Sequence, residues 1–167
     1  MTAVSNHNVV CLFREAVQRA PTNAAFIDAR ESDRAVSFTE LWDRVARVSV
    51  GLQARGIGPD DRLILMIPMS VDLYVVLLAV LKLGAVAVFV DPWIRLRQVA
   101  AFATFADPKA FIGIPKSHIY RIFERRLRTL PLTVSTGPVV ASFPAQVSLA
   151  QLLNSVPAHD IAIRRPH

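Results

Sequence analysis

One segment places groups that could do chemistry on either side of an apolar run. LKLGAVAVFVDP, residues 81–92, has Lys82 before the run and Asp91 after it. Gly84 interrupts the segment, so we expect a helix that ends at the glycine and a buried strand that ends at Asp91. Ligands of parallel sheets bind beyond the carboxyl ends of the strands, where Asp91 and Trp93 could border a substrate tunnel. We favour a plain turn there, with Lys82 at the negative end of the helix dipole.

The other reactive residue types are too scattered to indicate a catalytic or metal site. The four histidines lie far apart in the sequence, without ligand spacing: His7, His118, His159 and His167. Cys11 is the only cysteine, which excludes an intramolecular disulfide and a cysteine zinc cluster. We expect His118 to be exposed in the first turn of a helix. We therefore expect no catalytic, cofactor-binding or metal-binding residue in this chain.

Composition favours one domain with a sheet covered on both faces. The chain has 167 residues, of which 53% are apolar and 19% charged, and a typical soluble domain is about 25% charged. This length is enough for a sizeable core, and so many apolar residues indicate that most elements are buried on more than one side.

The net charge of +6 raises the question of an anionic partner such as a nucleic acid or a membrane surface. The densest basic cluster runs from Lys116 to Arg128, with Glu124 as its single acid. It lacks the interleaved aromatic residues of a nucleic-acid motif. We interpret it as a solvated helix face and expect no nucleic-acid partner. Residues 1–10 do not resemble a signal peptide, so we expect a cytoplasmic location.

The first third of the sequence predicts two helices and a strand pair. Residues 8–20 have apolar residues at helical spacing, and 24–28 and 35–38 read as short strands that pair. Ser37 and Glu40 have the spacing of a capping box, in which each side chain accepts from the other residue's backbone N–H. The helix that follows carries Glu40–Arg44 and Asp43–Arg47 pairs on its polar face.

Strands and helices then alternate. We expect strands at 63–67, 85–90, 110–114 and 132–136, and helices that begin at Ser70 and cover 96–106 and 117–127. In the last helix, the apolar face consists of Ile119, Ile122, Phe123 and Leu127. This alternation predicts βα units over about 62–136, a mostly parallel sheet and helices on both of its faces, which is a three-layer α/β fold. Residues 137–147 read as a loop and 148–154 as a short helix.

The stretch 73–90 admits a second interpretation as a membrane-spanning segment. It is apolar apart from Lys82, and a spanning helix needs about 20 apolar residues. Gly84 divides it into a helix-like half and a β-rich half. A buried helix followed by a buried strand explains both halves, so we expect no membrane span.

These elements carry a recognisable order. VSFTELWDRVARVSVGLQARGIGPDDRLILMIP (36–68), followed by 81–92, resembles the start of adenylate-forming, AMP-binding enzymes, the superfamily of acyl-CoA synthetases, nonribosomal-peptide adenylation domains and luciferases. Residues 37–41 are similar to its first core motif and 81–92 to its second. KAFIGIPKSHIYRIF (109–123) is similar to the long-chain acyl branch, which includes synthetases that close β-hydroxy acids to β-lactones. The resemblance covers 9–115 well and the rest more loosely.

The resemblance implies that the full-length enzyme uses ATP and magnesium to convert a carboxylate into an acyl-adenylate. The family's phosphate loop is a Ser/Thr/Gly-rich run that ends in lysine, and these 167 residues contain no such run. The other nucleotide motifs and the lysine of the C-terminal domain also have no counterpart. The resemblance therefore implies a fold, and no cofactor bound by this chain itself.

We therefore expect an N-terminal α/β subdomain over 1–158 and a truncated strand with a basic tail over 159–167. The expected function is that of an N-terminal fragment of a carboxylate-activating ligase, inactive alone and completed by the missing C-terminal portion. Self-association through an uncovered sheet edge is another expected contact, and an acyl substrate belongs to the full-length form. The alternative is a stand-alone binding or regulatory module derived from the same fold.

Overall fold

The computed structural model describes residues 8–28, 34–91, 94, 96–137 and 145–154. The N-terminal part consists of α1 (Val9–Arg19), a hairpin of β1 (Ala24–Asp28) and β2 (Arg34–Ser37), and α2 (Phe38–Gln53). The predicted strand pair is confirmed, since β1 and β2 pair antiparallel. The expected strand and tail at 159–167 lie outside the described residues.

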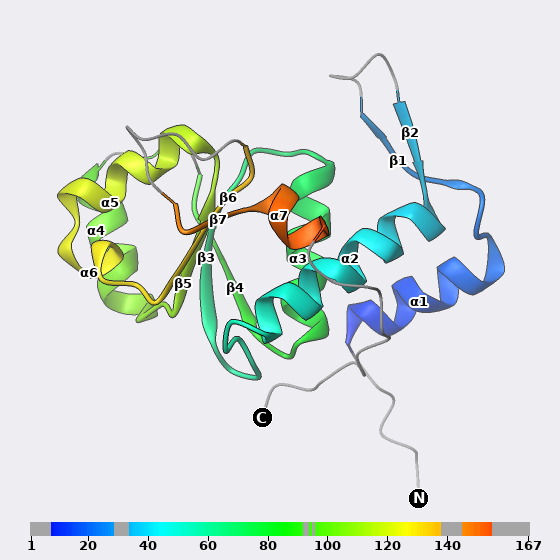
Figure 1. The fold of residues 1–167 in the computed structure, drawn as a ribbon, viewed down its shortest axis with the longest axis horizontal. Coiled ribbons are helices and arrows are strands. Elements are labelled where there is room, and N and C mark those ends of the chain that lie inside the picture. Colours follow the sequence, from blue (N-terminus) through cyan, green and yellow to red (C-terminus); the bar gives the residue numbers. More distant parts are fainter. Residues whose placement is uncertain (1–7, 29–33, 92–93, 95, 138–144, 155–167) are drawn as a thin grey trace, which may run out of the picture.

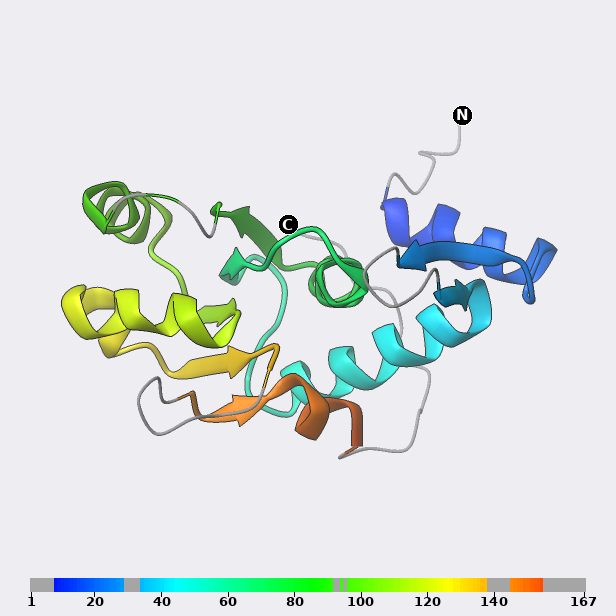
Figure 2. The same cartoon turned by 90° about the horizontal axis from the view of Figure 1, so that it is seen from above.

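The rest of the described chain forms a parallel sheet and its covering helices. The elements in order are β3 (Arg62–Met66), α3 (Val71–Lys82), β4 (Val86–Phe89), α4 (Leu96–Ala106), β5 (Ala110–Gly113), a 3-10 turn η1 (Pro115–Ile119), α5 (Tyr120–Phe123), α6 (Arg125–Arg128), β6 (Leu132–Ser135), β7 (Val147–Ser148) and α7 (Leu149–Asn154). The sheet has the order β4-β3-β5-β6-β7, and all its pairs are parallel. The predicted fold class is confirmed, and Figures 1 and 2 show helices on both faces of the sheet.

Alternate residues of the inner strands enter two separate cores. Leu63 and Leu65 of β3 join a core with α1, α2, α3 and α7. Ile64 and Met66 enter a smaller core with α4 and α6. Because successive side chains of a strand point to opposite faces, this division shows that the sheet is buried on both sides.

Local signals set the ends of α2 and α3. The hydroxyls of Ser37 and Ser70 accept the backbone N–H groups of Glu40 and Leu73, at 3.1 and 3.3 Å. The predicted capping box at Ser37 is half correct. The Glu40 carboxylate does not reach back to the cap but accepts from Arg44 at 2.6 Å and Arg34 at 3.3 Å, because an ion pair with two guanidinium groups competes for the same oxygen.

The backbone conformation at Gly84 explains why a glycine is needed within the segment 81–92. It has φ +72°, a backbone conformation that other residues rarely adopt. Its N–H donates to the Leu81 carbonyl and that of Ala85 to the Val80 carbonyl, both at 3.1 Å, which is the Schellman arrangement of a helix end. The chain then enters β4. None of the helices in the described part of the chain is long and apolar enough for a membrane crossing.

Two elements differ from the sequence prediction. The helix predicted over 117–127 is broken into η1, α5 and α6, because Glu124 has an extended backbone and caps α6 with its carboxylate. Residues 147–148, predicted partly as loop, form the edge strand β7. That strand is only two residues long and has no alternation for a sequence pattern to detect.

Lys82 is entirely buried although it carries an ammonium group. Its Nζ lies 4.5 Å from the centre of the Trp42 ring, and the ring also contacts Phe13. The electron-rich face of an indole attracts a cation, more strongly where water is excluded. The predicted place of Lys82 at the end of α3 is correct. Its contact with Trp42 of α2 additionally joins α3 to α2.

We predict a coupling free energy of about 1–2 kcal/mol between Lys82 and Trp42 in a double-mutant cycle, because each substitution alone removes the same cation–π contact. The cycle compares Lys82→Met, Trp42→Leu and the double variant by urea unfolding. It isolates this pair from the other contacts of either side chain. Additive effects of the two substitutions would show that the ring does not stabilise the ammonium group.

Candidate functional site

The carboxyl ends of the parallel strands are the first place to look for a site in this fold. At this edge β4 leads to Asp91, β5 to Gly113 and β6 to Ser135. Asp91 is exposed, and its backbone carbonyl accepts the N–H of Ile94 at 3.1 Å, as expected of a turn. Trp93 lies outside the described residues. Lys82 precedes β4 whereas Asp91 follows it, so the two polar groups of the motif lie at opposite ends of that strand.

Gly113 ends β5 in a space that excludes a side chain. A Cβ atom there would lie 2.2 Å from Ser117 Oγ and 3.1 Å from the carbonyl oxygen of Met66. The Ser117 hydroxyl donates to the Ile114 carbonyl at 2.7 Å, which closes the η1 turn over the end of the strand. The absence of a side chain at 113 is therefore a packing requirement, and the Ser117 hydroxyl is engaged within the turn.

His118 belongs to this turn, and its predicted exposure is wrong. The side chain is 1% exposed and packs edge-on against Phe111 at a centroid distance of 5.1 Å. Its Nε2 lies 3.2 Å from the Val134 carbonyl oxygen, and its Nδ1 lies 3.3 Å from Nη1 of Arg121. Since a guanidinium group can only donate, Nδ1 is the acceptor and Nε2 carries the proton that is donated to Val134.

The surroundings of His118 favour its neutral form. Burial, and after it the charge of Arg121, lower its pKa against the opposing effect of the backbone carbonyls of Val134 and Gly113, and the net result is a pKa of about 4. Burial also lowers the pKa of Arg121. Both ring nitrogens of His118 are engaged, with Val134 of β6 and Arg121 of α5, so the side chain joins these elements to the η1 turn.

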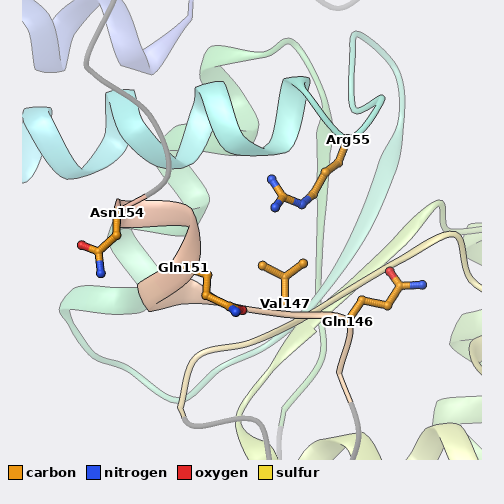
Figure 3. Close-up of a pocket in the computed structure, with 5 residues that line it drawn as sticks. All are labelled: Arg55, Gln146, Val147, Gln151 and Asn154. Atoms are coloured by element: carbon orange, nitrogen blue, oxygen red, sulfur yellow. The ribbon is translucent and has the colours of Figure 1, made fainter.

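A polar cavity lies beside β7, the edge strand at the other side of the sheet from β4. It has a volume of about 430 Å³ and is lined by Arg55, Gln146, Val147, Gln151 and Asn154. Figure 3 shows Arg55, beyond the end of α2, and Gln151, on α7, reaching toward Val147 of β7. The Oε1 atoms of both glutamines accept backbone N–H groups, and Nη1 of Arg55 donates to the Gly51 carbonyl at 2.8 Å. The polar side chains around the cavity are thus partly engaged with the backbone. No motif in the sequence pointed to it.

A second cavity is apolar. It has a volume of about 390 Å³ between α1, the β1–β2 hairpin and α3, and its lining includes Leu12, Phe26 and Tyr74. It offers apolar contact and little hydrogen bonding. Among the described residues, no group of three or more histidine, cysteine or acidic side chains could hold a metal ion. The expectation that the chain has no catalytic or cofactor-binding residue stays a prediction.

We predict that His118 makes the stability of the protein depend on pH between about 6.5 and 4. The unfolded chain takes up a proton near the ordinary pKa of 6.5, whereas the folded chain takes it up only near 4. The free energy of unfolding therefore falls as the pH decreases through this window, by about 3 kcal/mol in total, and this contribution is fully present above it.

Urea unfolding of the native chain and of His118→Gln across this pH range tests the prediction. The glutamine does not titrate, so the difference between the two pH profiles isolates the histidine from the carboxylates that titrate in the same range. Parallel profiles would show that His118 takes up its proton equally in the folded and unfolded states.

Comparison with known proteins identifies the family to which this chain belongs. The model of the AMP-binding enzyme family matches residues 13–160. The olefin beta-lactone synthetase of Stenotrophomonas maltophilia is 34% identical over 105 residues, which are 63% of this chain and 19% of that protein. That of Xanthomonas campestris pv. campestris is 37% identical over 99 residues, 59% of this chain and 17% of the relative. The chain thus spans about a fifth of the length of these relatives.

Solved structures agree on the fold. An anthranilate CoA ligase in complex with anthranoyl-AMP superposes with a TM-score of 0.80 at 15% identity, over 96% of this chain and 29% of that one. A benzoate CoA ligase from Burkholderia xenovorans gives a TM-score of 0.76 at 18% identity, over 93% of this chain and 30% of the other. Because the family model matches most of the sequence and the same fold recurs in these ligases, the chain belongs to the AMP-binding enzyme family.

Proposed function

We propose that these residues form the N-terminal part of an ATP-dependent ligase that activates a carboxylate as its acyl-adenylate. The observation that carries the proposal is the family match over residues 13–160. The likeness to beta-lactone synthetases, at 34% and 37% identity, favours a long-chain β-hydroxy acid as the carboxylate of the whole enzyme. The cytoplasmic location stays a prediction.

We further propose that these 167 residues do not form the adenylate by themselves. Adenylate formation needs groups that stabilise charge on the α-phosphate and on the departing pyrophosphate. The sequence contains no Ser/Thr/Gly-rich run ending in lysine that could supply them. At the described edge of the sheet, the polar side chains of Ser117 and His118 are engaged with backbone carbonyls.

ATP and magnesium belong to the chemistry of the family, and we propose that other parts of the full-length ligase hold them. Magnesium takes oxygen ligands, usually carboxylates together with substrate phosphates. The described part of the chain presents no cluster of acidic groups for this purpose. We therefore assign the nucleotide and the metal to the remainder of the full-length ligase, and the role of these residues is to provide one sheet of the scaffold and its packing surfaces.

The test is a chimera in which residues 1–167 replace the matching segment of the Stenotrophomonas maltophilia beta-lactone synthetase. ATP–pyrophosphate exchange is measured with a long-chain β-hydroxy acid. We expect exchange by the chimera and none by the 167-residue chain alone, because only the chimera contains a phosphate loop. Turnover by the chain alone would disprove its assignment as an incomplete part.

Two glycine substitutions serve as a matched pair in the chimera. Gly113→Ala places a methyl group against Ser117 and a backbone carbonyl, whereas Gly58→Ala meets only a side-chain oxygen at 4.0 Å. We expect the first to abolish or strongly reduce exchange and the second to leave it unchanged, since only the first disturbs the end of β5. Equal exchange in both variants would show that this sheet edge does not support activity.

The same experiment addresses the alternative of a stand-alone binding module. A chimera that folds, as shown by circular dichroism, but supports no exchange with β-hydroxy or unsubstituted fatty acids would favour that alternative. Exchange with the unsubstituted acid alone would retain the ligase and reject the beta-lactone branch.

A further inference from the structure

The break between α5 and α6 at Glu124 changes which residues of the predicted helix 117–127 are buried. The sequence predicts that Ile119, Ile122, Phe123 and Leu127 share the inner face of one helix. In the structure only Leu127 is buried, and Ile122 and Phe123 are 49% and 65% exposed. The change of backbone direction at Glu124 turns α6 inward through Leu127 and leaves the side chains of α5 outside.

A neighbouring helix adds a further exposed aromatic side chain. Phe105 of α4 is 91% exposed, and α4 contacts α6. Figures 1 and 2 show α4, α5 and α6 together on the sheet face away from α2 and α3. Isolated exposed apolar residues are common, but large ones grouped on one face mark an interaction surface, and here they lie on α4 and α5, which both contact α6.

Basic side chains accompany these apolar ones. Arg125, Arg126 and Arg128 occupy three of the four positions of α6, and all are exposed. None of the three forms an ion pair with a described residue. Glu124 is committed to the cap of α6, where its Oε1 accepts the Arg126 N–H at 3.1 Å. We name the set formed by Phe105, Ile122, Phe123, Arg125, Arg126 and Arg128 the basic–apolar surface.

The chemistry of this surface fits a partner that offers anionic groups beside an apolar layer. Anionic lipid headgroups attract arginine, and the acyl region just beneath them accepts phenylalanine and isoleucine side chains. A nucleic acid would also attract the arginines and could stack on the rings, but it would leave the aliphatic Ile122 in water. The lipid surface therefore satisfies more of the exposed side chains.

We propose that the basic–apolar surface docks the protein on the surface of a membrane that contains anionic lipids. The contact is peripheral, with the arginines at the headgroups and the apolar side chains at the acyl boundary, and requires no spanning helix. It is argued from other residues than the proposed ligase function, and it requires that the remainder of the full-length ligase leaves this face uncovered. It also revises our sequence-based interpretation of the basic cluster as a merely solvated helix face.

Co-sedimentation with phosphatidylcholine vesicles, with and without phosphatidylglycerol, tests the proposal on the 167-residue chain. We expect binding to vesicles that contain phosphatidylglycerol and little to those that do not. Arg126→Glu/Arg128→Glu should lower the partition coefficient by tenfold or more, on the order expected when basic residues near an anionic surface are reversed. Phe105→Ser/Phe123→Ser should also lower it, because apolar insertion contributes to binding.

Matched variants elsewhere on the surface separate docking from general charge attraction. Arg14→Glu/Arg19→Glu lowers the net charge as much as the α6 variant, at exposed positions of α1. Met69→Ser removes an apolar side chain that is 62% exposed. We expect neither to change binding more than twofold. Circular dichroism of each variant confirms that all retain the fold.

Three outcomes would overturn the proposal. The first is no binding to phosphatidylglycerol vesicles, and the second is an equal loss in the Arg14/Arg19 and Arg126/Arg128 variants. The third is tighter binding of a labelled single-stranded oligonucleotide than of the vesicles, which would assign the surface to nucleic acid.

Discussion

A parallel sheet covered on both faces has no solvent-facing side on its inner strands, and this constraint shapes the whole protein. Every residue of β3 from Leu63 to Met66 is buried, and so is every residue of β5. Parallel strands need crossover connections, which place helices on both faces. The helices must therefore present apolar sides to two separate cores, and polar groups are pushed to the strand ends and the outer surfaces.

The same constraint limits what the strand ends can do chemically. A polar side chain carried into the layer between the sheet and a helix must satisfy its hydrogen bonds there. Ser117 and His118 do so with the backbone carbonyls of Ile114 and Val134, and Lys82 meets the ring of Trp42. These groups contribute to holding the layers together. This agrees with our proposal that these residues supply scaffold to a larger ligase.

The outer helices carry the groups that the cores do not use. On the side of α2, ion pairs at i,i+4 spacing, such as Asp43–Arg47, cover the polar face. On the side of α6, arginines stand beside exposed Phe123 and Ile122 without a described carboxylate to pair with. The two outer surfaces of the domain thus differ. The surface of α2 has its charges paired and suits contact with water, whereas the surface of α5 and α6 has exposed arginines and apolar side chains that suit contact with a partner.

The sequence by itself determined the elements whose signals are local. Caps at Ser37 and Ser70, the glycine at 84 and the apolar strands could be predicted because their interactions join residues a few positions apart. Their order predicted the parallel sheet, and two motifs predicted the family. Tertiary structure alone decided the burial of His118, the exposure of Ile122 and Phe123, and the cavity beside Arg55. The burial of His118 and the cavity depend on which distant elements meet, as when β5 and β6 enclose the histidine. The exposure of Ile122 and Phe123 depends on the backbone break at Glu124. The apolar periodicity of the segment contains neither kind of information.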